Sequence, residues 1–122
     1  MGDRTPEELA REAGPLLAEL DRIEPISWDL GTPAVVEVEP VQRLIALGPA
    51  IVPLLLEQLE EEASEKRIAH VVLVLSHLAD ATVLPDLIAL RSRYQGRGSL
   101  GPWDYAVLGQ CNVAIERLRA PK

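Results

Sequence analysis

The chain has 122 residues, 48% of them hydrophobic and 25% charged, which is the composition of one folded domain and excludes a disordered chain. The formal net charge of −7 argues against non-specific binding to nucleic acid, because the phosphate backbone repels an acidic protein. The N-terminal residues lack the apolar segment of a signal peptide, and no run of about 18 apolar residues predicts a membrane span. Since the single cysteine, Cys111, excludes an internal disulfide, we expect a cytoplasmic protein.

Charge is distributed unevenly along the chain. Residues 1–65 hold 4 basic and 15 acidic side chains, a net charge of −11, whereas residues 66–122 hold 8 basic and 4 acidic ones, a net charge of +4. A partner of this protein would therefore meet an acidic first half and a mildly basic second half.

The first predicted helix begins at Pro6, because Thr5 can cap it and proline suits the first turn. Gly14 and Pro15 interrupt its apolar pattern, which predicts either two short helices or one bent helix. Helix breakers then make residues 24–39 a loop, whose apolar end is expected to be irregular or a lead-in to the next helix.

From Pro40 the helical pattern is continuous. A short helix is predicted up to Gly48, and a second helix follows from Pro49. Ser64 can cap the next helix, which runs to about Ala79. Its centre, residues 71–75, is apolar on every side, so other elements must cover it.

Two further helices complete the pattern. Asp80 caps one of them, and a glycine-containing loop over residues 95–101 ends it. The last helix starts at Pro102 and carries an apolar stripe at three- and four-residue steps. The stripe consists of Trp103, Val107, Cys111, Ala114 and Leu118. About six helices therefore account for the chain.

An internal repeat relates residues 47–59 to residues 79–91 at an offset of 32. Apolar pairs and a proline, Pro53 and Pro85, coincide at this offset. Repeat periods of about 20 to 50 residues are typical of solenoids, in which each helical hairpin buries its apolar face against its neighbours.

This pattern of a turn residue, an apolar pair, proline and further apolar pairs resembles the short HEAT-like helical repeats of bacterial proteins. It runs from Gly48 to Leu56 and again from Asp80 to Ile88. The resemblance implies an all-α fold, a right-handed stack of antiparallel helical hairpins. We therefore expect one domain over residues 1–122, with an irregular N-terminal helix and loop at 1–39 and repeat hairpins at 40–122.

Candidate binding residues gather near the loop between the last two helices. Arg91, Arg93 and Arg97 lie beside a predicted helix N-terminus and could receive an anionic group. A solvated basic patch is the alternative that we favour. Residues 96–101 match G-x-G-x-x-G, but the preceding strand and the βαβ unit of a dinucleotide site are missing from the pattern.

The aromatic residues supply further candidates. Trp28 lies in a polar loop and is the better candidate for an exposed anchor, while Trp103 is expected to seal the last helix onto the core. Tyr94 joins the arginines as a candidate partner-binding residue.

Histidine and cysteine give no catalytic pattern. His70 and His77 are seven residues apart, about 10 Å along a helix, which is too far for two ligands of one metal ion. Cys111 lies on the packed stripe of the last helix and is interpreted as a structural thiol. We expect no cofactor and no metal.

The leading hypothesis is a non-catalytic protein–protein interaction module, because stacked helical hairpins present an extended binding surface. The HEAT-like resemblance implies a scaffold, an accessory subunit, or an inhibitor or immunity-type partner of another protein. The alternative is an anion- or small-ligand-binding domain, or a HEAT-like enzyme, that uses Arg91, Arg93 and Arg97. A third hypothesis is a homo-oligomer formed through the end hairpins.

Overall fold

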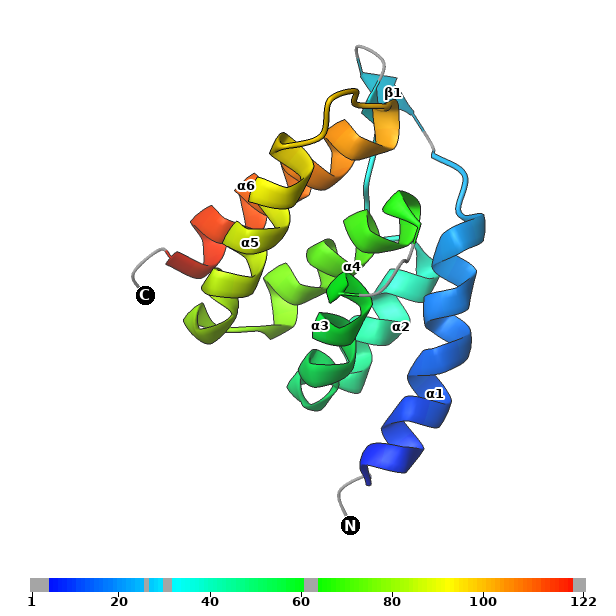
Figure 1. Cartoon of the computed structure of the whole chain (residues 1–122). Coiled ribbons are helices and arrows are strands. Elements are labelled where there is room, and N and C mark those ends of the chain that lie inside the picture. The colour runs from blue at the N-terminus through cyan, green and yellow to red at the C-terminus, as the bar shows by residue number, and fades with distance from the viewer. Residues whose placement is uncertain (1–4, 26, 30–31, 61–63, 120–122) are drawn as a thin grey trace.

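The computed structural model describes residues 5–25, 27–29, 32–60 and 64–119, and these residues form an all-helical fold (Figure 1). Six α-helices and three short 3-10 helices follow one another in the described residues. In chain order they are α1 (Pro6–Glu19), η1 (Leu20–Arg22), α2 (Glu39–Leu47), η2 (Pro49–Ile51), α3 (Val52–Glu60), α4 (Glu65–Leu78), η3 (Ala81–Val83), α5 (Leu84–Gln95) and α6 (Pro102–Arg119).

Helix α1 begins where the sequence predicts. The backbone N–H of Glu8 donates to Thr5 Oγ1 (3.2 Å), and Pro6 occupies the first turn. Of the two alternatives, two short helices or one bent helix, the structure excludes the first, since α1 continues through Pro15. Pro15 lies on the exposed side of the helix, so water can satisfy the carbonyl that loses its hydrogen bond there.

The loop between α1 and α2 contains a feature that the sequence pattern does not predict. Two-residue strands, β1 (Trp28–Asp29) and β2 (Thr32–Pro33), pair antiparallel, with Trp28 opposite Pro33. The apolar residues 35–38 are irregular, as expected. Strand β2 packs against α6, so the hairpin is tied to the C-terminal part of the fold (Figure 1).

The sequence repeat reappears as local structure. The 3-10 helices η2 and η3 begin 32 residues apart, and α3 and α5 follow them directly at the same offset of 32 residues. Equivalent side chains are equally buried: Ile51 and Val83 lie in the core, as do Leu55 and Leu87. The same apolar spacing therefore produces the same succession of a 3-10 helix and an α-helix twice.

Helix α4 is the centre of the fold. It contacts α2 and α3 on one side and α6 on the other, and η1 and α1 also touch it. Its described residues from Ile68 to Val72 are all buried, which confirms that its apolar surface is covered on most sides. Ser64 caps the helix by accepting the N–H of Arg67 (3.1 Å).

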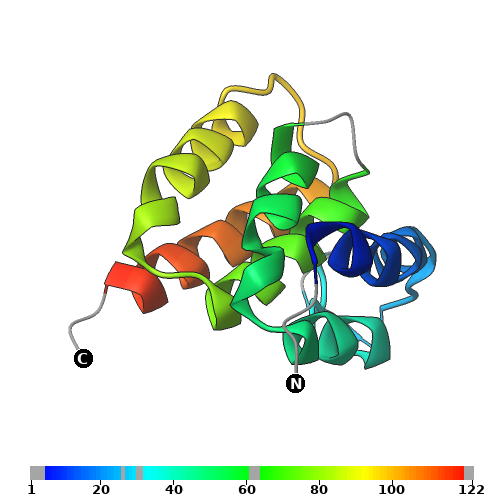
Figure 2. The same cartoon turned by 90° about the horizontal axis from the view of Figure 1, so that it is seen from below.

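The helices meet at different angles. Helices α5 and α6 lie side by side and run antiparallel (Figures 1 and 2). The segments 39–47 and 49–59 change direction by 97°, so α2 and α3 form a right-angled corner rather than the antiparallel hairpin expected there. Gly48, at φ 89°, makes the sharp turn between them.

One hydrophobic core joins all six helices. It extends from Leu9 in α1 to Ile115 in α6, and includes buried residues of every α-helix between them. The N-terminal part is therefore less irregular than expected, because α1 is a regular helix that buries its apolar face in this core. In the described parts of the chain, no individual helix has both the length and the apolarity to cross a membrane.

Candidate functional site

Of the three arginines at the predicted anion site, Arg97 turns its side chain toward other residues of the same chain. Arg97 Nη1 donates to Asp104 Oδ1 (2.6 Å) and to Glu65 Oε1 (3.2 Å). Its guanidinium also lies over the ring of Tyr94, with Cζ 3.9 Å from the ring centroid. Arg97 therefore connects the end of α5 with the first turns of α4 and α6.

Asp104 completes this cluster at the N-terminus of α6. It is the third residue of the helix, and its Oδ2 accepts the backbone N–H of Gly101 (2.7 Å). A carboxylate in this position satisfies an otherwise unpaired N–H and interacts favourably with the helix dipole. The anion that the sequence pattern expected at this helix end is thus a side chain of the same protein.

The other arginines do not converge on the same point. Arg91 Nη1 donates to Asn112 Oδ1 on α6 (3.1 Å). Arg93 is exposed, with Cζ 5.7 Å from the Tyr94 ring centroid, and lines a hollow beside α3. The loop over residues 96–101 follows α5, not a strand, so it lacks the context of a dinucleotide site.

Tyr94 does not offer a contact surface, and this candidate is wrong. Its side chain is fully buried within the core and covered by Arg97. Burial raises the pKa of its hydroxyl above the ordinary value of 10.0. The tyrosine is a packing residue that supports the arginine above it.

Trp28 is exposed, as the sequence suggested. Of its side chain, 55% is accessible, although strand pairing places it opposite the buried Pro33. An aromatic side chain on a strand that pairs with a neighbouring strand loses less freedom on binding than one on a free loop, which suits it to anchor a partner.

Two exposed apolar residues were missed by the sequence analysis. Tyr105 and Val113 lie on α6 and are 53% and 48% accessible. They are eight residues apart, with Gly109 midway, so all three lie on the same side of the helix. The sequence contained this i, i+4, i+8 spacing. The apolar stripe on the opposite side of α6 was already sufficient to predict the helix, so the second spacing was not used.

That opposite stripe behaves as expected. Val107, Cys111 and Ala114 are buried. Trp103 packs half-buried against α4, with its ring centroid 6.0 Å from that of His70, and so helps seal α6 onto the core. Burial raises the pKa of the Cys111 thiol to about 12, which leaves almost no thiolate near neutral pH.

The two histidines have separate environments. His70 is buried, its Nδ1 lies 2.7 Å from the carbonyl of Lys66, and its Nε2 finds no hydrogen-bond partner among the described residues. Desolvation lowers the pKa of His70 below 6.5. His77 Nε2 instead lies 2.6 Å from Glu37 Oε1. Within the described ranges, no three potential metal-binding side chains of His, Cys, Asp or Glu gather.

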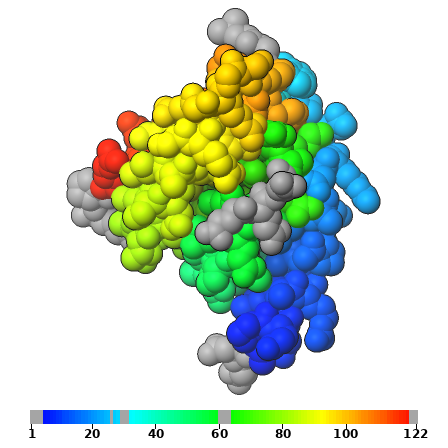
Figure 3. All heavy atoms as spheres, in the orientation of Figure 1, coloured from blue at the N-terminus to red at the C-terminus, as the bar shows by residue number. Residues whose placement is uncertain are grey.

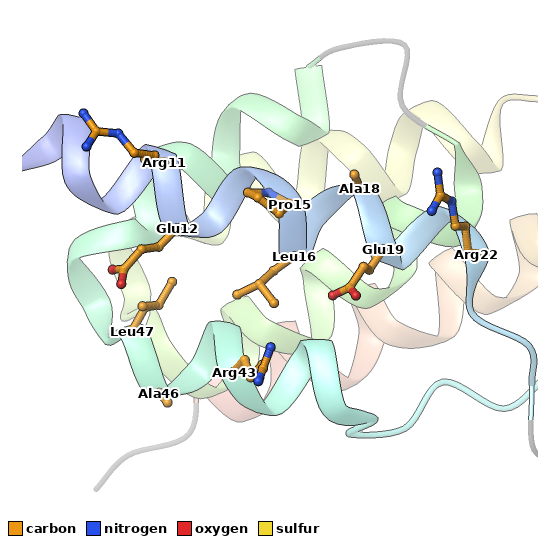
Figure 4. A pocket seen from close by; sticks show the side chains of 10 residues that line it. All are labelled: Arg11, Glu12, Pro15, Leu16, Ala18, Glu19, Arg22, Arg43, Ala46 and Leu47. Atoms are coloured by element: carbon orange, nitrogen blue, oxygen red, sulfur yellow. The ribbon is translucent and has the colours of Figure 1, made fainter.

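Open grooves lie between the described helices. One of about 720 Å³ runs between α1 and α2 (Figure 4). Leu16 and Leu47 point toward each other across it, and Glu12, Glu19 and Arg43 also reach into the space. A smaller groove, about 180 Å³, has walls from α3 and α5, which adjoin on the face shown in Figure 3.

A second ionic cluster fastens the N-terminal helices to α4. Arg67 Nη2 pairs with Asp21 Oδ2 (2.5 Å), and Ser64 Oγ donates to Asp21 Oδ1 (2.6 Å). Partial burial alone would raise the pKa of Asp21, but these hydrogen bonds outweigh it and hold the pKa below the ordinary value. Arg67 also donates to Gln58 of α3 (3.0 Å), so the cluster is part of the helix packing.

Comparison with known proteins gives no significant match, whether to a family model, to a curated protein or to a solved structure. The fold places the chain in the class of all-helical proteins. Its exposed apolar residues and its inward-facing ionic clusters are the observations from which a function must be inferred.

Proposed function

We propose that this protein is a HEAT-like, non-catalytic protein–protein interaction module of the cytoplasm, which serves as a scaffold, an accessory subunit, or an inhibitor or immunity-type partner. The observation that carries this proposal is the exposure of Trp28 on strand β1, which pairs with β2. Tryptophan is among the residues most enriched at binding hot spots, and exposing one costs solubility unless a partner covers it.

The repeated succession of a 3-10 helix and an α-helix, η2–α3 and η3–α5, supports the HEAT-like part of the proposal. Their 32-residue offset and matching buried positions are what a right-handed stack of repeated helical units would require. The antiparallel pair α5 and α6 provides one hairpin of such a stack. The free thiol of Cys111 suits a reducing cytoplasm.

The alternative function is binding of an anion or a small ligand, or an enzyme activity, at Arg91, Arg93 and Arg97. It has less support, because Arg97 pairs with Asp104 and Glu65 and Arg91 pairs with Asn112. An incoming anion would have to displace two carboxylates from Arg97.

The experiment compares capture of proteins from the cell extract by the natural chain and by Trp28→Ala, followed by titration of the purified captured protein. We expect Trp28→Ala to weaken binding by roughly 30-fold, which corresponds to a hot-spot loss of about 2 kcal/mol. Ser92→Ala is the control, because it shortens an exposed side chain on α5, away from the hairpin.

Equal binding by Trp28→Ala and the natural chain would contradict the proposed anchor. If no protein binds, and inorganic phosphate or a nucleotide alone raises the melting temperature, the small-ligand alternative replaces the interaction module. Loss of that thermal shift in Arg93→Ala would locate the ligand at the arginines.

A further inference from the structure

The groove between α1 and α2 has an apolar floor. The two helices run in opposite directions along it, and Leu16 and Leu47 point toward each other across it (Figure 4). Three smaller apolar side chains also line it and are exposed: Pro15, Ala18 and Ala46. They leave a hollow of about 720 Å³, into which the larger side chains of a partner can reach. Burial of this apolar surface by a partner is favourable, because it removes apolar area from water.

The basic side chains in the acidic half of the chain gather at this groove. Residues 1–65 hold 4 basic and 15 acidic side chains. The described basic ones are Arg11, Arg22 and Arg43, and all three line the groove. Of the described acidic side chains, Glu12 and Glu19 line it as well, so three arginines and two glutamates leave a net charge of +1 there. Local positive charge within an acidic half favours an occupant that carries negative charge.

These arginines are not used to hold the helices together. Arg11 and Arg22 are exposed, and neither forms an ion pair or a side-chain hydrogen bond with another described residue. Arg43 lies 3.7 Å from Glu39, one turn earlier on α2, and a pair so exposed contributes little to stability. Arg97, by contrast, is held by carboxylates at 2.6 and 3.2 Å. The groove therefore presents guanidinium groups that can donate paired hydrogen bonds to the carboxylates of a partner.

The spacing along α1 and η1 sets the length of the occupant. Arg11 and Arg22 lie at opposite ends of the groove (Figure 4). They are eleven residues apart, which is about three helical turns or ~16 Å. Pro15 and Ala18 lie between them, four and seven residues after Arg11, so the four residues form one line along the helix. Three turns of a second helix would match this line, with charge at both ends and apolar side chains in the middle.

We propose that this groove binds one amphipathic helix of a partner protein. The apolar stripe of that helix packs on Leu16 and Leu47, and its acidic side chains pair with Arg11 and Arg22. Helices commonly bind in grooves of this kind through apolar residues at three- and four-residue steps. A nucleic acid or an anionic membrane fits less well, because either would extend beyond the groove and meet the negative charge of residues 1–65.

The first test titrates the purified full chain into a labelled helical peptide and follows its fluorescence anisotropy. The peptide is about 16 residues long and carries two glutamates eleven residues apart, with leucines four and seven residues after the first glutamate. We expect a dissociation constant on the order of 100 μM, because one short helix makes a small interface. A peptide with lysine in place of both glutamates should bind at least about tenfold more weakly.

The second test assigns the charged ends. Arg11→Ala and Arg22→Ala should each weaken binding of the glutamate peptide about fivefold, because each removes one paired charge. Arg93→Ala removes an exposed arginine from α5 and should leave the affinity unchanged. Arg11→Glu should bind the glutamate peptide poorly and recover when the glutamate that faces it is replaced by lysine. The end at which lysine restores binding gives the direction of the bound helix.

The third test fills the floor of the groove. Ala46→Trp should weaken binding at least about tenfold, since the indole occupies space that the leucines of the peptide need. Ala89→Trp makes the same change at an exposed position of α5 and is the control. Circular dichroism and thermal unfolding show whether each variant is folded, and the arginine variants test the site independently of Ala46.

Three kinds of result would overturn the inference. The glutamate and lysine peptides could bind equally, or neither could bind up to about 1 mM. Arg11→Ala and Arg22→Ala could both bind as tightly as the natural chain. The natural chain could bind vesicles of phosphatidylglycerol, or a second copy of itself in sedimentation equilibrium, and lose that binding in Arg11→Glu, which would replace the partner helix by a membrane or by self-association.

The inference rests on the proposed function only in naming a protein as the partner, and the two fail separately. Trp28 is not among the described residues that line the groove, so Trp28→Ala should bind the peptide as the natural chain does. Failure of the peptide, with binding of the captured protein still lost in Trp28→Ala, would reject the groove alone. Binding of the peptide, with the captured protein bound equally by Trp28→Ala, would reject the tryptophan anchor alone.

Discussion

The arginine loop at the end of α5 and the exposed side of α6 that carries Tyr105 and Val113 are close in the chain but opposite in character. The loop is rich in charge, yet its central side chain, Arg97, is held by Asp104, Glu65 and the ring of Tyr94. Tyr105 and Val113 are uncharged and about half exposed. Charge is satisfied within the molecule at the first surface, and apolar area is left uncovered at the second.

The difference between these two regions shows which kind of surface retains an attraction for a binding partner. A buried or half-buried ion pair holds helices together and leaves little attraction for a ligand. Uncovered apolar side chains retain their attraction for another surface, because burying them removes apolar area from water. Binding is therefore expected where apolar side chains are left uncovered, and stability where charges meet.

The sharpest contrast is between the two sides of α6 itself. Cys111 is buried and its pKa is raised to about 12 from 9.0, so its thiol should react with a thiol reagent roughly a thousandfold more slowly in the folded chain than in urea. A time course with an aromatic disulfide reagent measures both rates. Val113→Cys in a Cys111→Ala background should react rapidly without urea. Rates within about tenfold for folded and unfolded Cys111 would show that α6 opens readily.

Removal of the carboxylate at the start of α6 tests whether the arginine loop is structural. Asp104→Ala should lower the free energy of unfolding by about 2 kcal/mol, because Arg97 and the Gly101 N–H both lose a charged acceptor. Urea unfolding measures this change. Asp86 occupies the same third position of α5 but is exposed, so Asp86→Ala should cost less than about 0.5 kcal/mol. Equal losses in the two variants would refute the assigned role.

Acidification tests the contact between His70 of α4 and Trp103 of α6, on the buried side of α6. The pKa of buried His70 lies below 6.5 in the folded chain, so the unfolded chain takes up its proton first as the pH falls. Stability should therefore be full above pH 6.5 and decline below it, with a slope no steeper than about 1.4 kcal/mol per pH unit.

Urea unfolding between pH 5 and 8 measures this slope. Comparison with variants separates the contribution of His70 to the slope from that of other titrating groups. His70→Gln should flatten the slope, whereas His77→Gln, on the exposed side of α4, should retain it. A slope that survives in His70→Gln would assign the pH dependence to another group.

The smallest expected effect is the change in stability when either of two glycines, Gly109 or Gly48, is replaced by alanine. Gly109→Ala should raise the stability of the monomer by about 0.5–1 kcal/mol, because the helix gains a better helix former and the added methyl group meets open space among the described residues. Gly48→Ala should instead lower it by about 1 kcal/mol, since φ 89° is unfavourable for alanine. Thermal unfolding of dilute samples measures both shifts. A loss of stability in Gly109→Ala would reveal a contact inside the monomer.

Local signals in the sequence predicted most of the helical elements. Thr5 and Ser64 cap helices as expected, and Gly48 ends α2, because capping depends on a few neighbouring residues. Asp80 caps the 3-10 helix η3 that leads into α5, not α5 itself. The apolar spacing on α4 and the 32-residue repeat also predicted burial correctly. The sequence left open whether Gly14 and Pro15 divide the first helix or bend it. The helix continues, since the buried residues on both sides of the proline outweigh one lost hydrogen bond.

The site could be predicted only in part. The exposure of Trp28 was expected, but the burial of Tyr94 was not. A tyrosine between arginines in the sequence indicates a surface position, and only the position of α6 shows that this tyrosine is covered. Arg97 found its carboxylates at Glu65 and Asp104, which are 32 residues before it and 7 after it. No local pattern states that these three residues meet.

The sequence by itself determined the helices, their caps and the faces that enter the core, because these depend on side-chain spacing within one or two turns. Only the tertiary structure decided which charges pair, the 97° corner at Gly48, the hairpin that carries Trp28, and the uncovered side of α6. Those features depend on contacts between distant segments, whose geometry is set when α4 is enclosed by its neighbours.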